Sequence, residues 1–297
     1  MNFALGDGLG GFTPGPGLEP GHSSPRGLVT AEVTGDDLPD VLVLTDEDTM
    51  LLFATTGDGT PPPPQLLPLP EEWLRDLATG DLDGDGDTDL LAVGDSVVLL
   101  RNDGAGKFAP ESFATDGGMW RGGVVLHDLD GDGDLDAVVG RYANQGGAVE
   151  VLHNDGTGVM TSVQQLDMVD GVTSLALLPT GPDTAPIVLI TAGHAMQHAQ
   201  VAGDGTLEAP QSFAGDTLYE ALTGRFDGDA RPDAMLLEVG SLGALLGHDT
   251  WPAALVPVAD VEISFWPTGT AIGDVNGDGL DDIALSFFDL EVFVSNP

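Results

Sequence analysis

The chain has 297 residues, with 49 Asp and Glu against 8 Lys and Arg, which gives a formal net charge of −41. So few cations cannot neutralise a phosphate backbone, so we expect no nucleic-acid partner, and an anionic membrane surface is an equally poor one. With 41% hydrophobic residues, the chain is too apolar for a disordered acidic tail. Its 43 glycines and 21 prolines predict many turns and short strands.

Cysteine is absent, which excludes disulfides and thiolate metal sites. No apolar run approaches the roughly 18 residues of a membrane-spanning helix, so we expect no membrane insertion. The first 20 residues lack a basic segment followed by an apolar core, so we expect any export signal to lie outside this chain.

One acidic phrase recurs along the chain in a constant phase, which is the signature of a repeat architecture. In chain order the copies are Glu32–Asp40, Asp81–Asp89, Asp128–Asp136, Leu178–Pro186, Arg225–Asp233 and Asp274–Asp282. Their fourth residues are glycines 47 to 50 residues apart: Gly35, Gly84, Gly131, Gly181, Gly228 and Gly277. The second, third and sixth copies follow Asp-x-Asp/Asn-Gly-Asp-Gly most closely, and the fourth keeps the glycine without the acids.

Each phrase leads into a short apolar run that predicts a strand. These runs are Val41–Leu44, Leu90–Val93, Ala137–Val139, Ile187–Ile190, Ala234–Leu237 and Ile283–Leu285. Further strand-like runs follow, as in Val97–Leu100, Val149–Leu152 and Val292–Val294. Tight-turn signals come next, at Gly57–Gly59, Asn102–Gly104, Asn154–Gly156 and Gly203–Gly205, and Asp-Gly there predicts two-residue hairpin turns.

Each repeat of roughly 48 residues therefore holds about four short strands. A unit of that size cannot bury both faces of its sheet alone, and a β-propeller solves this by radial repetition. We predict an all-β propeller of four-stranded blades that occupies residues 1–297 as a single domain, with six blades, or seven as the alternative. The N-terminal Phe3–Phe12 matches the hairpin half of a repeat, Leu99–Phe108, so we expect it to supply the outer strand of a last blade whose inner strands come from the C-terminus.

The repeated loops resemble the FG-GAP/VCBS repeats of integrin-α-type propellers, and their bacterial branch more closely, because the Phe-Gly and Gly-Ala-Pro half of the animal motif is not legible here. The resemblance covers essentially the whole chain. It implies calcium in the loop between the first and second strands of a blade, and a binding role more often than an enzymatic one.

The residues themselves also indicate calcium. Loop positions 1, 3 and 5 direct oxygens at one centre, the carbonyl of position 7 and the carboxylate of position 9 complete the cage, and several oxygen ligands suit Ca²⁺. The predicted ligands are Glu32, Thr34, Asp36, Leu38, Asp40, Asp81, Asp83, Asp85, Asp87, Asp89, Asp128, Asp130, Asp132, Asp134, Asp136, Asp274, Asn276, Asp278, Leu280 and Asp282. An EF-hand is excluded, because its bidentate Glu at position 12 is replaced by apolar residues such as Ala92 and Val139.

The sites are not expected to be equal, and we predict three to four ions. In the loop Arg225–Asp233 a guanidinium at position 1 repels the ion, and we expect it to pair with Asp227 or Asp233 instead. The loop Leu178–Pro186 is expected to be empty. Calcium is expected to stabilise the hairpin of each blade rather than to bridge a ligand, because crowded carboxylates repel one another without a cation.

A candidate binding surface comes from the tryptophans. Trp73, Trp120 and Trp266 each precede a loop glycine by 11 residues, and Arg75 and Arg121 lie beside two of them. These residues are expected at the opposite end of the first strand from the acidic loop. They are therefore predicted to form an aromatic rim for a glycan or protein ligand. The alternative is that the indoles pack between neighbouring blades.

We expect an extracellular or cell-surface recognition module that is monomeric as an isolated domain. Calcium suggests this location, because weak-to-moderate sites stay filled where calcium is millimolar. No catalytic constellation is evident, so an enzyme is not expected. The alternatives are the propeller domain of a carbohydrate-active enzyme and a structural cell-surface domain.

Overall fold

The computed structural model describes residues 2–6, 12–17, 25–45, 49–56, 63–70, 74–113, 121–142, 146–180, 185–193, 195–212, 218–227, 229, 231–238, 241–245, 256–257, 269–286 and 290–293. The regular elements in these ranges are strands, which confirms the all-β prediction. Within the same ranges, no helix has the length and apolar character needed to cross a membrane.

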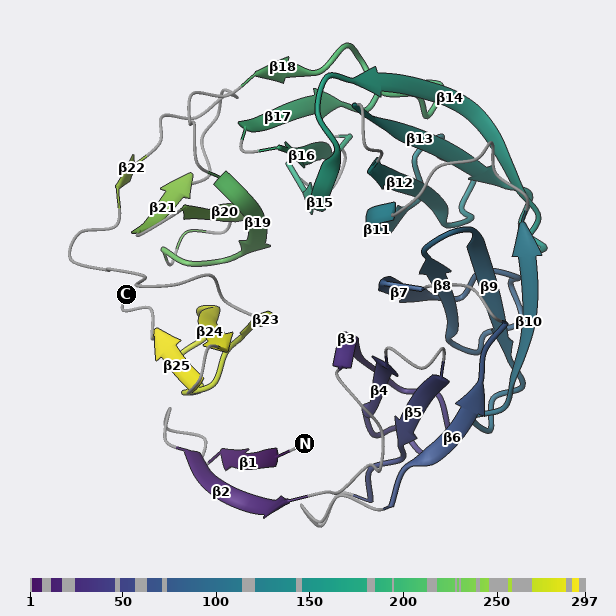
Figure 1. The fold of residues 1–297 in the computed structure, drawn as a ribbon, viewed down its shortest axis with the longest axis vertical. Coiled ribbons are helices and arrows are strands. Elements are labelled where there is room, and N and C mark those ends of the chain that lie inside the picture. The colour runs from purple at the N-terminus through teal and green to yellow at the C-terminus, as the bar shows by residue number, and fades with distance from the viewer. Residues whose placement is uncertain are drawn as a thin grey trace. The chain divides into compact units, whose positions relative to one another are not determined.

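The strands form five four-stranded sheets, one three-stranded sheet and one two-stranded sheet (Figure 1). The first sheet contains β3 (Pro25–Ala31), β4 (Asp40–Thr45), β5 (Thr49–Phe53) and β6 (Gln65–Pro68). The second contains β7 (Asp76–Gly80), β8 (Asp89–Val93), β9 (Val97–Asn102) and β10 (Phe108–Phe113). The third contains β11 (Arg121–His127), β12 (Asp136–Tyr142), β13 (Gly147–Asn154) and β14 (Met160–Met168).

The remaining sheets follow the same chain order. The fourth contains β15 (Val172–Leu178), β16 (Ile187–Ala192), β17 (Ala195–Gln200) and β18 (Gln211–Ser212). The fifth contains β19 (Leu218–Gly224), β20 (Asp233–Glu238), β21 (Ser241–Leu245) and β22 (Val256–Pro257). The three-stranded sheet contains β23 (Gly269–Gly273), β24 (Asp282–Ser286) and β25 (Leu290–Phe293), and the two-stranded sheet contains β1 (Asn2–Gly6) and β2 (Phe12–Gly17).

The chain divides into two compact units. One unit consists of residues 1–3, 15–173 and 202–207, and the other of residues 4–14, 174–201 and 208–297. In the first unit, the second sheet lies between the first and the third, and strands β3, β7 and β11 are neighbours (Figure 1). In the second unit, β19 contacts both β16 and β23.

Strand β8 shows why the apolar runs are continuous rather than alternating. All of its residues are buried, and successive side chains of a strand point to opposite faces. Leu90 and Ala92 pack into a cluster shared with the first sheet, whereas Leu91 and Val93 pack into a cluster shared with the third. A sheet covered on both faces requires apolar residues at every position of its strands. The burial of both faces therefore explains the continuous apolar runs, such as Leu90–Val93, that follow the acidic phrases.

The turns between the third and fourth strands differ from the predicted two-residue hairpins. Between β9 and β10 the turn spans residues 103–107, with a hydrogen bond of 3.2 Å from Asp103 N to Lys107 O. Gly104 and Gly106 have φ of 70° and 72°, which side chains rarely adopt. The side chain of Asn102 lengthens the turn, because its Oδ1 accepts a hydrogen bond from Gly106 N.

The predicted closure of a last blade by the N-terminus remains a prediction. Among the described residues, β1 and β2 pair with each other, and the sheet of β23, β24 and β25 has three strands.

Candidate metal-binding loops

The acidic phrases lie where they were predicted, between the first and second strands of their sheets. The loop that begins at Asp81 joins β7 to β8, and the loop that begins at Asp128 joins β11 to β12. The glycines at positions 4 and 6 of the Asp81 loop, Gly84 and Gly86, have φ of 76° and 93°. In the loop Glu32–Asp40, position 6 is Asp37, which adopts φ of 65° without being glycine and so carries backbone strain.

The position-1 carboxylate organises each of the three best loops. Asp81 accepts hydrogen bonds from the backbone N–H of Gly84 at 2.8 Å and of Gly86 at 3.0 Å. Asp128 and Asp274 accept the same two bonds in their own loops. The bond from Gly279 N is the largest cause of a lowered pKa at Asp274, so this position is held as a carboxylate.

Positions 1, 3 and 5 converge in two loops, as predicted. One carboxylate oxygen from each of Asp81, Asp83 and Asp85 lies within 4.8 Å of the others, and Asp128, Asp130 and Asp132 form the same group. These clusters of hard oxygen donors fit a Ca²⁺ ion, which binds oxygen at about 2.3–2.6 Å.

Position 7 offers more than its backbone carbonyl. A side chain at Gly104 would come within 2.5 Å of Asp87 Oδ2, so the Asp87 carboxylate lies against the turn of its own sheet. Desolvation, followed by the charges of Asp85 and Asp103, raises the pKa of Asp87. Asp134 has a raised pKa in the third sheet, with desolvation again the largest cause. The carboxylates of Asp87 and Asp134 thus lie among the other acids of their loops, beside the carbonyl that was predicted to ligate the ion.

The position-9 carboxylate is bonded at both oxygens, which the sequence reasoning did not anticipate. Asp89 is completely buried; its Oδ2 accepts from Leu82 N at 3.0 Å and its Oδ1 from Asn102 N at 2.8 Å. Asp136 and Asp40 repeat this pair of bonds in their own sheets. The residue therefore ties the start of the loop to the end of the third strand, whatever it contributes to a metal.

The asparagine of the following turn connects neighbouring sheets of the first unit. Asn154 Nδ2 donates to Leu82 O of the second sheet at 2.8 Å and to Leu135 O of its own loop at 3.2 Å. Asn102 makes the equivalent bonds to Val33 O and Thr88 O. The first and second acidic loops are thus each held from one side by the next sheet.

A basic side chain contacts position 3 in both full acidic loops, and this partner was also missed. Arg101 Nη1 donates to Asp83 Oδ2 at 2.6 Å, and His153 Nδ1 lies 3.4 Å from Asp130 Oδ2. Arg101 and His153 each directly precede the turn asparagine of their sheet. In the first sheet, where position 3 is the uncharged Thr34, the residue at this point is Ala54.

The loop Arg225–Asp233 keeps position 9 but not position 1. Asp233 Oδ2 accepts from Phe226 N at 2.8 Å, as in the other loops. Arg225 was expected to pair with Asp227 or Asp233, but its Nη2 donates to Gly279 O of the neighbouring loop at 3.2 Å, and its backbone N–H donates to Asp281. Residues 181–184 of the loop Leu178–Pro186, which was expected to be empty, lie outside the described residues.

Of the predicted rim, Trp73, Trp120 and Trp266 lie outside the described residues. Arg75 is exposed and directly precedes β7, and Arg121 is the first residue of β11.

A third arginine, Arg26, lies near the start of β3, at the same end of its sheet, and the sequence reasoning passed over it. Partial desolvation, and then the charge of Arg26, lowers the pKa of Arg75. The repeat phase was the available signal, because Arg26 and Arg75 both precede their loop glycine by nine residues.

Comparison with protein families identifies the loops. A profile described as "FG-GAP-like repeat" matches residues 32–92 and 81–139. Residues 32–139 carry FG-GAP-like repeats. The matched region contains the first three acidic loops in full, and it confirms the resemblance on which calcium was expected.

Solved structures confirm the β-propeller fold with four-stranded blades. An Agrocybe aegerita lectin that recognises non-reducing terminal N-acetylglucosamine aligns with a TM-score of 0.67 at 15% identity, over 99% of this chain and 88% of that one. BBS1N in complex with ARL6DN aligns with a TM-score of 0.59 at 12% identity, over 93% and 81%. The Dos1 propeller aligns with a TM-score of 0.58 at 10% identity, over 92% and 68%. Among curated proteins, none matches this sequence.

Proposed function

We propose that this FG-GAP-like propeller is a calcium-stabilised recognition module that binds a glycan or a protein, and that it is not an enzyme. The observation that carries the calcium part is the convergence of Asp81, Asp83 and Asp85, with oxygens within 4.8 Å of one another, on a loop whose backbone is already turned for them. The ion would supply the positive charge that holds these carboxylates together.

Three to four ions are proposed, as in the expectation from the sequence. The loops at Asp81, Asp128 and Asp274 share the position-1 geometry, and Glu32 replaces it in the first loop by accepting from Thr34 N at 2.9 Å and from Asp36 N at 3.3 Å. The carbonyl of Leu38 or Leu280 and the side chains of Asp36, Asp278, Asn276 and the remaining loop acids would complete the coordination.

The recognition part is supported by the basic end of the sheets. In a chain with a net charge of −41, Arg26, Arg75 and Arg121 lie near the starts of β3, β7 and β11, the end remote from the acidic loops. Arg and Trp side chains are over-represented in binding hot spots, and the predicted rim residues Trp73 and Trp120 come one or two residues before Arg75 and Arg121 in the sequence. The lectin with the same fold recognises a terminal sugar, which makes glycans the first ligand class to test.

Within this proposal the propeller has six blades, the last one closed by the N-terminal strand, and forms one domain over residues 1–297 that is monomeric in isolation. We place it outside the cell or on its surface, where calcium is millimolar and moderate sites stay occupied.

The metal part is tested by calcium titration calorimetry and by thermal melting with and without chelator. We expect three to four bound ions and a lower melting temperature in chelator, because a ligand that binds only the folded state stabilises it. Absence of calcium uptake would reject this part of the proposal.

The recognition part is tested on a glycan array, in calcium and in chelator. A Trp73→Ala/Trp120→Ala/Trp266→Ala variant should lose the glycan signal while keeping the calcium count of the wild type. If the variant also binds fewer calcium ions than the wild type, the indoles are structural. An unchanged glycan signal would reject the proposal that these tryptophans bind the ligand.

A further inference from the structure

The third sheet differs from the second in one metal-relevant residue. Arg101 on β9 and His153 on β13 directly precede the asparagines Asn102 and Asn154, whose backbone N–H groups bond the buried position-9 aspartate in the same way. The two side chains are therefore equivalent, and each contacts position 3 of its loop. A guanidinium cannot ligate a metal ion, whereas a neutral imidazole is the commonest nitrogen ligand in proteins.

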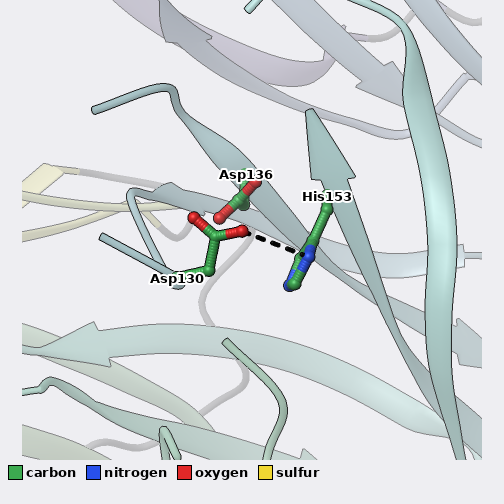
Figure 2. Close-up of side chains that lie close together, drawn as sticks. All are labelled: Asp130, Asp136 and His153. Carbon is green, nitrogen blue, oxygen red and sulfur yellow. Dashed lines mark ion pairs between the residues drawn. The ribbon is translucent and has the colours of Figure 1, made fainter. Parts of the chain in front are cut away.

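Around His153, three ligand atoms of mixed type lie together. One atom each from Asp130, Asp136 and His153 lies within 4.8 Å of the others, and Figure 2 shows the two carboxylates and the imidazole turned toward one another. The group is shielded from water, because the exposed fractions of the Asp130 and His153 side chains are 26% and 19% and Asp136 is completely buried.

The distance from His153 Nδ1 to Asp130 Oδ2 is compatible with a metal site as well as with a weak ion pair. At 3.4 Å it is longer than the roughly 2.7–2.9 Å of a charge-assisted hydrogen bond, and the equivalent Arg101–Asp83 bond is 2.6 Å. Two ligands of a tetrahedral zinc ion are about 3.3–3.5 Å apart, because each lies about 2.0–2.2 Å from the metal.

The second ring nitrogen of His153 is also not satisfied by the protein. Among the described residues, Nε2 is buried without a hydrogen-bond partner. It faces the backbone of Gly205, where a side chain would come within 2.5 Å of it. The ring is therefore not fixed by a second hydrogen bond through Nε2, and Nδ1, which lies nearer to Asp130, is the atom that would ligate the ion.

From these contacts we infer that Asp130, Asp136 and His153 form a binding site for a divalent transition-metal ion such as Zn²⁺, which adds an imidazole ligand to two carboxylates of the third acidic loop. Imidazole nitrogen with carboxylate oxygens suits zinc and its neighbours, whereas Ca²⁺ takes oxygen ligands. The second sheet lacks such a site, because Arg101 occupies the equivalent place. Since Asp130 and Asp136 are also positions 3 and 9 of their calcium loop, occupancy by the transition metal weakens calcium binding at that loop.

The test uses the whole chain, stripped of metal and then saturated with calcium, titrated with Zn²⁺ by calorimetry and with Co²⁺ by absorption spectroscopy. We expect one tightly bound ion per chain and visible d–d bands from a nitrogen and oxygen ligand set. The His153→Arg variant copies the second sheet and should bind at least about tenfold more weakly, because it loses a direct ligand. The matched control His127→Ala, at the end of β11 in the same sheet, should bind like the wild type.

A second variant tests the inference by gain rather than loss. Arg101→His copies the third sheet and should add a second transition-metal ion, a result that misfolding cannot produce. Absence of zinc and cobalt uptake in the wild type, or uptake that His153→Arg does not reduce, overturns the inference. Calcium uptake is measured on the same samples, so a chain that binds calcium but no zinc rejects this site alone, and one that binds zinc but no calcium rejects the proposed calcium function alone.

Discussion

The loops Asp81–Asp89 and Arg225–Asp233 have the same residue at position 9 but different residues at position 1. In both, the position-9 aspartate is completely buried and accepts a hydrogen bond from the backbone N–H of position 2. Only the first has an aspartate at position 1, which gathers the N–H groups of Gly84 and Gly86.

This difference separates two functions that the repeat motif combines. Position 9 is needed for the loop to join its two strands, and it persists where position 1 is arginine. Position 1 is needed for the metal cluster, and it is replaced where a cation side chain bonds the neighbouring loop instead.

The largest effect is expected from removing position 9. Asp89→Ala deletes a buried carboxylate and leaves the N–H groups of Leu82 and Asn102 without their acceptor, so we expect a loss of about 3–5 kcal/mol in the free energy of unfolding. The measurement is urea denaturation, in calcium and in chelator. A loss that disappears in chelator would show that position 9 acts through the metal and would remove the distinction between the two loops.

A smaller effect is expected from restoring position 1 in the fifth sheet. Arg225→Asp introduces the missing carboxylate at position 1 and removes the bond to Gly279 O. We expect one additional calcium ion per chain by calorimetry and about 2–3 kcal/mol more stabilisation by calcium at 100-fold excess over Kd. Arg225→Ala is the control, since it removes the cation without adding a ligand and should leave the calcium count unchanged.

The smallest effect concerns pH in the metal-free protein. Because the folded state raises the pKa of Asp87, chiefly by desolvation, its contribution to stability is complete below the ordinary pKa of about 3.8 and is lost as the pH rises through the raised value. Asp87→Asn should therefore raise the melting temperature of the calcium-free protein at pH 7 and reduce the gain that the wild type shows on mild acidification. Equal pH profiles of the two proteins in chelator would contradict the assignment.

Much of the fold followed from the repeat phase. The glycine spacing and the apolar runs predicted four short strands per repeat and placed the acidic loops between the first and second strands. These features could be predicted because two-sided burial requires continuous apolar runs and positive φ favours glycine, and both patterns are local in the sequence. The predicted two-residue turns were wrong in length: the turn 103–107 is closed around a hydrogen bond from Gly106 N to Asn102 Oδ1, which an Asp-Gly pair alone does not indicate.

The candidate site divides in the same way. The side chains of Asp81, Asp83 and Asp85 were identified from spacing alone, because a loop of alternating acids with glycines between them converges by its own geometry. Arg101 and His153 were not identified, because they lie 18 and 23 residues from the aspartates they contact and reach them only through antiparallel pairing.

The sequence by itself determined the repeat, the strand content and the acidic loops, because each depends on residues close together in the chain. Only the tertiary structure showed that the position-9 aspartate is buried and hydrogen-bonded at both oxygens, and which turn asparagine bonds which loop. It alone also showed which carboxylates Arg101 and His153 contact. These depend on register between strands and on packing between sheets, and local residue patterns do not encode them.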